Sequence, residues 1–119
     1  MRRVILALMV FALPAPLHAM TVATFMAKWE ALEGEGLSMV LSQDFAELEA
    51  EIESARLSLR EERVAAQLGG RAQAYCPTRG GLTMPQLLSH LSTIPETSRA
   101  AMPFREGLKS FLSKKFPCG

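Results

Sequence analysis

The sequence predicts an all-α fold: a small bundle of about four helices with one disulfide. Apolar residues recur every three or four positions in several segments, the spacing that places them on one face of a helix. Capping residues and prolines mark where these segments begin and end. No stretch shows the alternation of apolar and polar residues that is typical of a half-buried strand. Two cysteines, each beside a proline, suit a single structural bridge.

Residues 1–19 have the layout of a secretory signal peptide. Two arginines near the start precede an apolar run from Val4 to Leu13, and Ala19 is a small residue at the cleavage position. A run of about ten residues spans roughly 15 Å as a helix, half of a bilayer core, so it is too short for a permanent anchor. We therefore expect an exported protein, cleaved after Ala19 or alternatively after Ala15. A buried N-terminal helix is the competing interpretation.

We expect residues 20–119 to form one domain, because about 100 residues is the usual size of a single domain. Without Arg2 and Arg3, the 13 basic residues fall to 11 against 12 acidic ones, a formal net charge of −1. This balance gives no electrostatic footprint for nucleic acid. We also expect no membrane insertion once the signal peptide is removed.

The first helix of this domain is expected to begin after Thr21, which can cap it, and to end at Gly34 and Gly36. Its apolar face has helical spacing and consists of Val22, Phe25, Met26, Trp29 and Leu32. The run from Leu37 to Leu41 is too short to assign from its pattern. It is either one helical turn that packs its leucines against the core or the start of the next helix.

The longest helix is expected from Gln43 to Leu68, with Ser42 as its cap. Its apolar residues fall close to a seven-residue repeat, and its charges change from acidic to basic along the chain, which suits the helix dipole. Exposed pairs such as Glu53 with Arg56 contribute a few tenths of a kcal/mol each. We interpret the charged side as a solvated face, with a binding face as the alternative. Pairing of this helix between two copies, as a homodimer, stays open.

The clearest helix start lies in the C-terminal part, where Thr83 to Gln86 has the pattern of a capping box. Pro85 lies in the first turn, where its missing N–H costs nothing. This helix should end near Thr93, because the residue before a proline disfavours the helical conformation. After a short turn, the last helix is expected to begin at Met102-Pro103 and to end before Pro117.

We predict a disulfide between Cys76 and Cys118, which have 41 residues between them. On the chain-entropy account, closing a loop of roughly 43 residues stabilises the domain by about 4 kcal/mol. A redox pair and an intermolecular bridge are the alternatives. A redox pair is the weaker of the two, because the chain lacks the Cys-x-x-Cys pattern that lowers a thiol pKa.

The sequence shows no catalytic constellation, and we expect neither an enzyme, nor a metal site, nor a cofactor. The expected mature chain has one histidine, His90, which together with two oxidised cysteines does not make a zinc site. Its carboxylates on the long helix, such as Glu61-Glu62, are adjacent on a solvated surface and not set across a cleft as glycoside hydrolysis requires. The Gly80-Gly81 pair lacks a phosphate-loop pattern.

A block of short motifs at the C-terminal end carries a resemblance to a known family. In order, it consists of Tyr75-Cys76-Pro77, Gly81-Leu82-Thr83, Gln86-Leu87, Leu91, Pro95 and Phe116-Pro117-Cys118. This block resembles the Tai-type immunity proteins of type VI secretion, the Rap/Tai family. The similarity covers about 43 of the 119 residues, together with the signal peptide and the overall size.

The resemblance implies a small helical protein of the periplasm, commonly dimeric, that binds a peptidoglycan amidase effector and occludes its active site. It also implies the bridge between the two cysteines. Such inhibition would use a rigid loop that enters the cleft of the enzyme, because pre-organisation lowers the entropy lost on binding. The candidate partner-binding residues lie beside Cys76 and in the turn after Pro95. They are Thr78, Arg79, Gly80, Glu96 and Arg99.

Two other functions compete with inhibition of an amidase. One is a periplasmic chaperone of the acid-stress kind, whose glutamate-rich helix would lose charge near pH 4 and expose apolar surface. The other is an interaction module of an envelope complex, with the charged long helix as its contact face.

Overall fold

The computed structural model describes residues 20–77 and 80–118. The expected signal peptide and two expected partner-binding residues, Thr78 and Arg79, lie outside the described residues. The described part forms six helices and no strand: α1 (Val22–Glu33), η1 (Gly36–Leu41), α2 (Gln43–Leu68), α3 (Met84–Ser92), α4 (Glu96–Arg99) and α5 (Phe104–Lys115). Because α1, α2, α3 and α5 are the four of substantial length, the expected all-α bundle of about four helices is confirmed.

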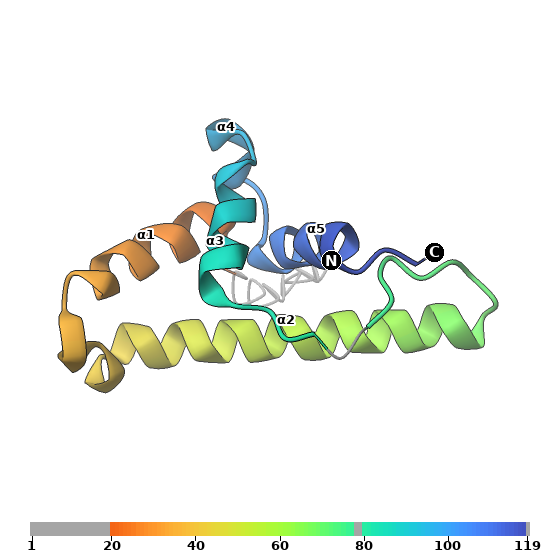
Figure 1. Ribbon diagram of the computed structural model, residues 1–119, viewed down its shortest axis with the longest axis horizontal. Coiled ribbons are helices and arrows are strands. Elements are labelled where there is room, and N and C mark those ends of the chain that lie inside the picture. The colour runs from red at the N-terminus through yellow and green to blue at the C-terminus, as the bar shows by residue number, and fades with distance from the viewer. Residues whose placement is uncertain (1–19, 78–79, 119) are drawn as a thin grey trace, which may run out of the picture.

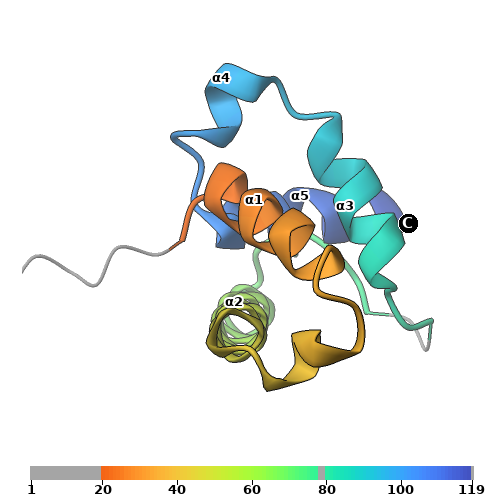
Figure 2. The ribbon, with the colours of Figure 1, turned by 90° about the vertical axis from the view of Figure 1, so that its left-hand side faces the viewer.

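Helix α2 forms the base of the molecule, and α1, α3 and α5 lie on one side of it (Figure 1). Helices α1 and α5 both pack on α2, and α3 packs on α5. Figure 2 views α2 end-on and shows α1 and α5 above it, with the short α4 at the far end of the molecule from α2. One face of the long helix is therefore covered by the bundle.

The covered face of α2 carries the apolar repeat that the sequence shows. Its buried residues are Leu48, Ala55, Leu59 and Ala66. Leu68, which follows this repeat in the sequence, is instead 84% exposed. The pair expected on the outer side is present, with Arg56 Nη2 and a Glu53 carboxylate oxygen 3.1 Å apart.

The core is centred on two aromatic rings from opposite ends of the chain. Phe25 of α1 and Phe104 of α5 are stacked, with ring centroids 4.1 Å apart and an angle of 17° between the planes, and both are fully buried. Gly107 of α5 lies against Val22 and Leu91, because a Cβ there would be 2.7 Å and 2.9 Å from their methyl carbons. A side chain at position 107 would therefore force these three helices apart.

The expected helix caps are present, with one difference. Ser42 accepts a hydrogen bond from the Asp44 amide, and Thr83 accepts one from the Gln86 amide at 3.4 Å. The side chain of Gln86 does not return to the cap as a full capping box requires. Its carbonyl oxygen accepts from the ammonium of Lys115 on α5 and so ties α3 to α5.

The predicted disulfide between Cys76 and Cys118 is confirmed. The two Cα atoms are 5.0 Å apart, and the amide of Cys76 donates to the carbonyl of Phe116 at 2.8 Å. Both cysteines are in this intramolecular bridge. The bridge therefore fixes the C-terminal end to the connection between α2 and α3.

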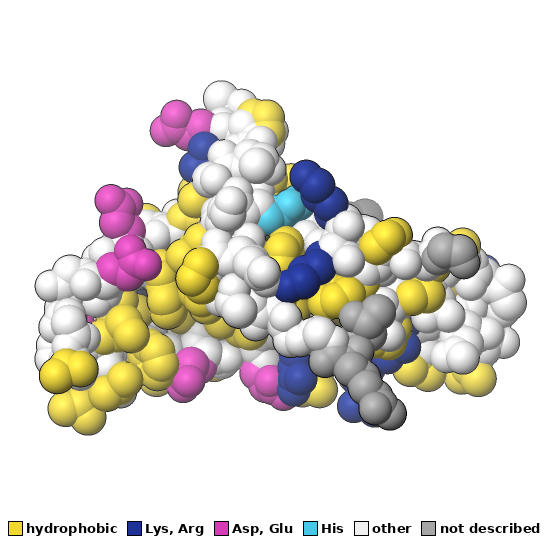
Figure 3. All heavy atoms as spheres, in the orientation of Figure 1, with side chains coloured by type: hydrophobic (Ala, Val, Ile, Leu, Met, Phe, Trp, Pro, Cys, Tyr) yellow, Lys and Arg dark blue, Asp and Glu magenta, His cyan; other side chains and the backbone are white. Residues whose placement is uncertain are grey.

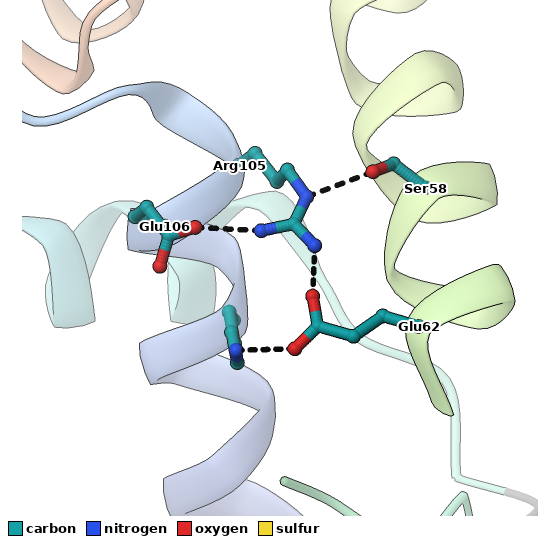
Figure 4. Close-up of polar contacts among 5 residues, drawn as sticks. Ser58, Glu62, Arg105 and Glu106 are labelled. Carbon is teal, nitrogen blue, oxygen red and sulfur yellow. Dashed lines mark hydrogen bonds and ion pairs between the residues drawn. The ribbon is translucent and has the colours of Figure 1, made fainter. Parts of the chain in front are cut away.

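A polar cluster joins α2 to α5 (Figure 4). Glu62 of α2 accepts from both Arg105 and Lys109 of α5. Arg105 also donates to the Ser58 hydroxyl at 2.8 Å and to Glu106 at 2.6 Å. Hydrogen bonds from Lys109 and then Arg105 hold the pKa of Glu62 below its usual value.

Candidate partner-binding surface

The turn between α1 and α2 presents three large apolar side chains to solvent. Leu37 is 98% exposed, Leu41 88% and Val40 60%. We call these three residues the η1 tip. They lie at the end of the molecule where the chain passes from α1 into α2 (Figure 1), and hydrophobic side chains gather there in the space-filling view (Figure 3). Exposed apolar residues that are clustered mark interaction sites more often than scattered ones do.

The backbone of η1 decides which of its residues point outward. A 3₁₀ helix has three residues per turn, so Leu37 and Val40 share one side while Met39 turns inward and packs against the core. The helix starts at Gly36, whose φ of +64° is a conformation that favours glycine. The Ser38 hydroxyl donates to the Glu35 carbonyl at 2.8 Å, which fixes the first turn. The backbone of the tip thus packs against both α1 and α2.

Of the two alternatives for this run, a separate helical segment is the one that forms, but its leucines do not pack against the core. Met39 is the residue of η1 that packs against the core, whereas Leu37 and Leu41 face solvent. The signal that could have shown this is the glycine at position 36, directly before the run. It lets the chain reverse and leaves the following residues at the outer edge of the turn.

Charge is divided unevenly along the chain, and the η1 tip lies in the acidic part. Residues 20–55 contain eight acidic residues and one basic residue, Lys28, whereas residues 56–118 contain ten basic and four acidic ones. Lys28 is itself paired, at 2.6 Å from Glu47 and 3.7 Å from Asp44. A partner that covers the tip would thus meet negatively charged residues around it. This charge favours a partner whose contact surface has a basic rim.

The first expected partner-binding surface lies beside the disulfide. Gly80 is exposed and is the first residue of the described segment 80–118. It lines a hollow of about 420 Å³ between α2 and the connection to α3. Arg56, Arg60 and Arg63 of α2 line the same hollow. The guanidinium of Arg63 lies 5.9 Å from the centre of the Tyr75 ring. This surface is therefore basic, unlike the η1 tip.

The second expected surface, on α4, has one outward and one inward residue. Glu96 is exposed, but Arg99 is half-buried and donates to the Ile94 carbonyl at 2.8 Å. Its guanidinium also lies 3.9 Å from the Met26 sulfur of α1. Arg99 thus holds α4 against α1. A role of either residue in binding stays a prediction.

The two expected surfaces are not brought together by the fold. Gly80 precedes α3 and Glu96 follows it, and these ends of α3 lie on opposite sides of the molecule (Figure 1). The η1 tip is a third, separate region. One partner that contacted all three would have to wrap around the bundle.

His90 lies in a shallow hollow of about 560 Å³ between α3 and α5. Its Nε2 is 2.9 Å from the Ser110 hydroxyl, and its ring packs at a tilt on Phe111 with centroids 5.5 Å apart. Burial, and then the charge of Lys114, lowers the pKa of His90. Among the described residues no carboxylate hydrogen-bonds the ring, so the pair lacks the orienting group of a catalytic triad.

Residues 20–77 and 80–118 contain neither a metal-ligand cluster nor a membrane-spanning helix. No group of three or more potential metal-ligating side chains of the His, Cys, Asp and Glu types is found in this part of the chain. None of its helices combines the length and apolar character needed to cross a bilayer.

Comparison with known proteins adds no family or neighbour. No protein-family model, curated protein or solved structure matches the chain. The resemblance to the Tai-type immunity proteins therefore stays a prediction from the C-terminal motifs.

Proposed function

We propose that the mature chain is a periplasmic binding protein that neutralises a peptidoglycan amidase by occluding its active site. The signal-peptide pattern and the resemblance of the C-terminal block support this function. The observation that carries it is the η1 tip, three exposed apolar side chains on a short helix at an edge of the fold. A protruding apolar turn of this kind can enter a cleft that a flat surface cannot.

The energetics of the η1 tip suit binding. Complete burial of an aliphatic side chain of this size contributes about 1.5–3 kcal/mol, so three such residues can anchor an interface. Because η1 is fixed between α1 and α2, little conformational entropy is lost when a partner covers it. The acidic residues around the tip would favour partners with a basic cleft rim and repel others.

Capture in the periplasm tests this function. The full chain is expressed with its leader, crosslinked in the periplasm and purified, and the bound proteins are identified by mass spectrometry. Recovery of one peptidoglycan hydrolase at equal stoichiometry would support the proposal. A set of unrelated envelope proteins, or a single partner that is not a hydrolase, would contradict it.

An acid-stress chaperone is the second candidate, and one observation favours it. Glu51 of α2 is half-buried, and burial raises its pKa above the usual value. As the pH falls, such a carboxyl gains its proton at a higher pH than an ordinary glutamate does. It also lies within residues 20–55, the acidic part of the chain. The two functions differ at neutral pH, where only the amidase inhibitor binds its partner.

A homodimer would use the outer side of α2. Leu57, Val64 and Leu68 are exposed there and line one shallow hollow with Arg60 and Glu61. These three residues are seven and four positions apart and so form one apolar stripe along α2, and an isologous contact between two copies would bury both stripes together. We propose this side of α2 as the contact between two copies.

A further inference from the structure

The hollow of about 420 Å³ beside the disulfide combines a row of cations with an apolar lining. Arg56, Arg60 and Arg63 lie four and three positions apart, so they follow one side of α2 with about 5–6 Å between neighbouring Cβ atoms. We call this space the arginine hollow. The rest of its lining is mainly apolar and includes Ile52, Leu82, Leu108, Leu112 and Phe116.

Two of the three positive charges are not neutralised within the described part of the chain. Neither Arg60 nor Arg63 forms an ion pair with a described carboxylate. Arg56 pairs with Glu53, but both side chains are mostly exposed, so this pair contributes little. Glu62, which is next to Arg63 in the sequence, already accepts from two cations of α5. The arginine hollow therefore has an excess of positive charge.

Part of the Arg63 guanidinium is buried without a hydrogen-bond partner. Its Nε is almost inaccessible to solvent, and no acceptor for this N–H is found among the described residues. The guanidinium lies 5.9 Å from the centre of the Tyr75 ring, which also lines the arginine hollow. A charged donor that is buried without an acceptor costs free energy. An anion bound beside Arg63 would offset part of this cost through its charge.

We propose that the arginine hollow binds a phosphorylated amphiphile, with its phosphate head on Arg60 and Arg63 and its apolar tail against Ile52 and Leu82. A phosphate monoester has three acceptor oxygens and can therefore accept from two guanidinium forks at once. Leu82 is 40% exposed, and a tail that covers it removes apolar surface from water. Small-molecule sites typically have this volume and combine apolar walls with a few polar groups.

This binding site is separate from the η1 tip and does not rest on the amidase. The two regions share no residue, so a ligand in the arginine hollow leaves the η1 tip free. A failed capture of the amidase leaves the ligand site untouched, and a failed ligand titration leaves the proposed function untouched.

The test is a calorimetric titration of the protein, purified after expression of the full chain, with octyl phosphate below its micellar concentration. Inorganic phosphate, which lacks the tail, and octyl glucoside, which lacks the charge, are the matched probes. We expect octyl phosphate to bind at one site roughly tenfold or more tightly than either of them. Absence of octyl phosphate binding, or equal affinity for it and either matched probe, would overturn the proposal.

Substitutions locate the site. Arg60→Gln and Arg63→Gln should each weaken octyl phosphate binding more than fivefold, whereas Leu82→Ser should bring its affinity closer to that of inorganic phosphate. The control is Arg71→Gln, an exposed arginine outside the arginine hollow, which should bind as the wild type does. Because Arg60 is exposed, its variant should keep the wild-type melting temperature even if Arg63→Gln does not. Unchanged affinity of Arg60→Gln would refute the site.

Sedimentation with lipid vesicles identifies the source of the phosphate. Pelleting with phosphatidylglycerol vesicles but not with phosphatidylcholine vesicles, lost in Arg60→Gln, would support the site and assign the head to a membrane lipid. Binding of octyl phosphate without pelleting would support the site and assign it to a free amphiphile. Pelleting that is the same for the wild type and Arg60→Gln would contradict a role of the arginine hollow in membrane binding.

Discussion

Glu62 of α2 and Arg105 of α5 form an ion pair across the interface between the two helices (Figure 4). Lys109, one turn further along α5, donates to the other carboxylate oxygen of Glu62. Two cations thus converge on one carboxylate. The side chain of Glu62 is 40% exposed, so solvent screens part of this attraction.

The first prediction concerns the pH dependence of this contact. Because the folded-state pKa of Glu62 is lowered, its contribution to stability is present at neutral pH and is lost as the pH falls below about 4.5. We expect Glu62→Gln to lower the free energy of unfolding at pH 7 by about 0.5–1 kcal/mol and to match the wild type near pH 3. Urea unfolding at both pH values measures this. Glu61→Gln, an exposed neighbour, is the control and should have no effect at either pH.

The second prediction concerns the bridge between Cys76 and Cys118. Replacing both residues with serine should lower the free energy of unfolding by about 4 kcal/mol, because the unfolded chain loses a closed loop. Urea unfolding of the variant should match that of the reduced wild type. A variant as stable as the oxidised wild type would show that packing of α5 alone holds the C-terminal end in place.

The third prediction concerns the contact of Gly107 with Val22 and Leu91. Gly107→Ala should destabilise the domain by about 1–3 kcal/mol, because its methyl group would overlap both side chains in a close-packed core. Gly81→Ala is the control, since a Cβ at Gly81 would meet nothing within 4 Å. Thermal unfolding of both variants measures the difference. Equal melting temperatures of the two variants would mean that the helices accommodate the added methyl group at position 107 without loss of stability.

The fourth prediction concerns a second copy on α2. If two chains pair along its outer side, Leu57→Glu combined with Val64→Glu should shift sedimentation from dimer to monomer without lowering the melting temperature of the monomer. Both side chains are exposed in the single chain, so the substitutions should not destabilise the monomer. A wild type that sediments as a monomer up to high micromolar concentration would rule this contact out.

Much of the helical framework could be predicted because its signals are local. Ser42 and Thr83 cap helices through bonds to the following two or three residues, and the repeat of Leu48, Ala55 and Leu59 follows from the helix period. Such features need no knowledge of the tertiary structure. The pairing of the cysteines could also be predicted, because a chain with two cysteines allows only one intramolecular disulfide.

Features that depend on tertiary neighbours could not be predicted in the same way. Gln86 has the sequence position of a capping residue, but Lys115 of α5 competes for its side chain. Arg99 was expected on a binding surface, whereas the nearby Ile94 carbonyl and Met26 sulfur draw its guanidinium inward. Neither competitor can be recognised before the helices are placed.

The η1 tip was missed for a related reason. A five-residue run with four apolar residues suits a buried turn and an exposed one equally, because a run this short does not indicate a face by its periodicity. The position of Gly36 and the inward choice of Met39 decide the outcome. A short apolar run directly after a glycine between two helices is thus a place to look for an exposed surface.

The most direct test of the proposed function is a titration of peptidoglycan hydrolysis by the captured enzyme with purified variants of this protein. The wild type and the control Gln67→Asp, an exposed residue at the far end of α2, should stop hydrolysis at equal stoichiometry. The variant Leu37→Asp with Leu41→Asp should need more than tenfold higher concentration, at an unchanged melting temperature. Full inhibition by this variant would contradict a binding role for the η1 tip, and no inhibition by the wild type would contradict the function itself.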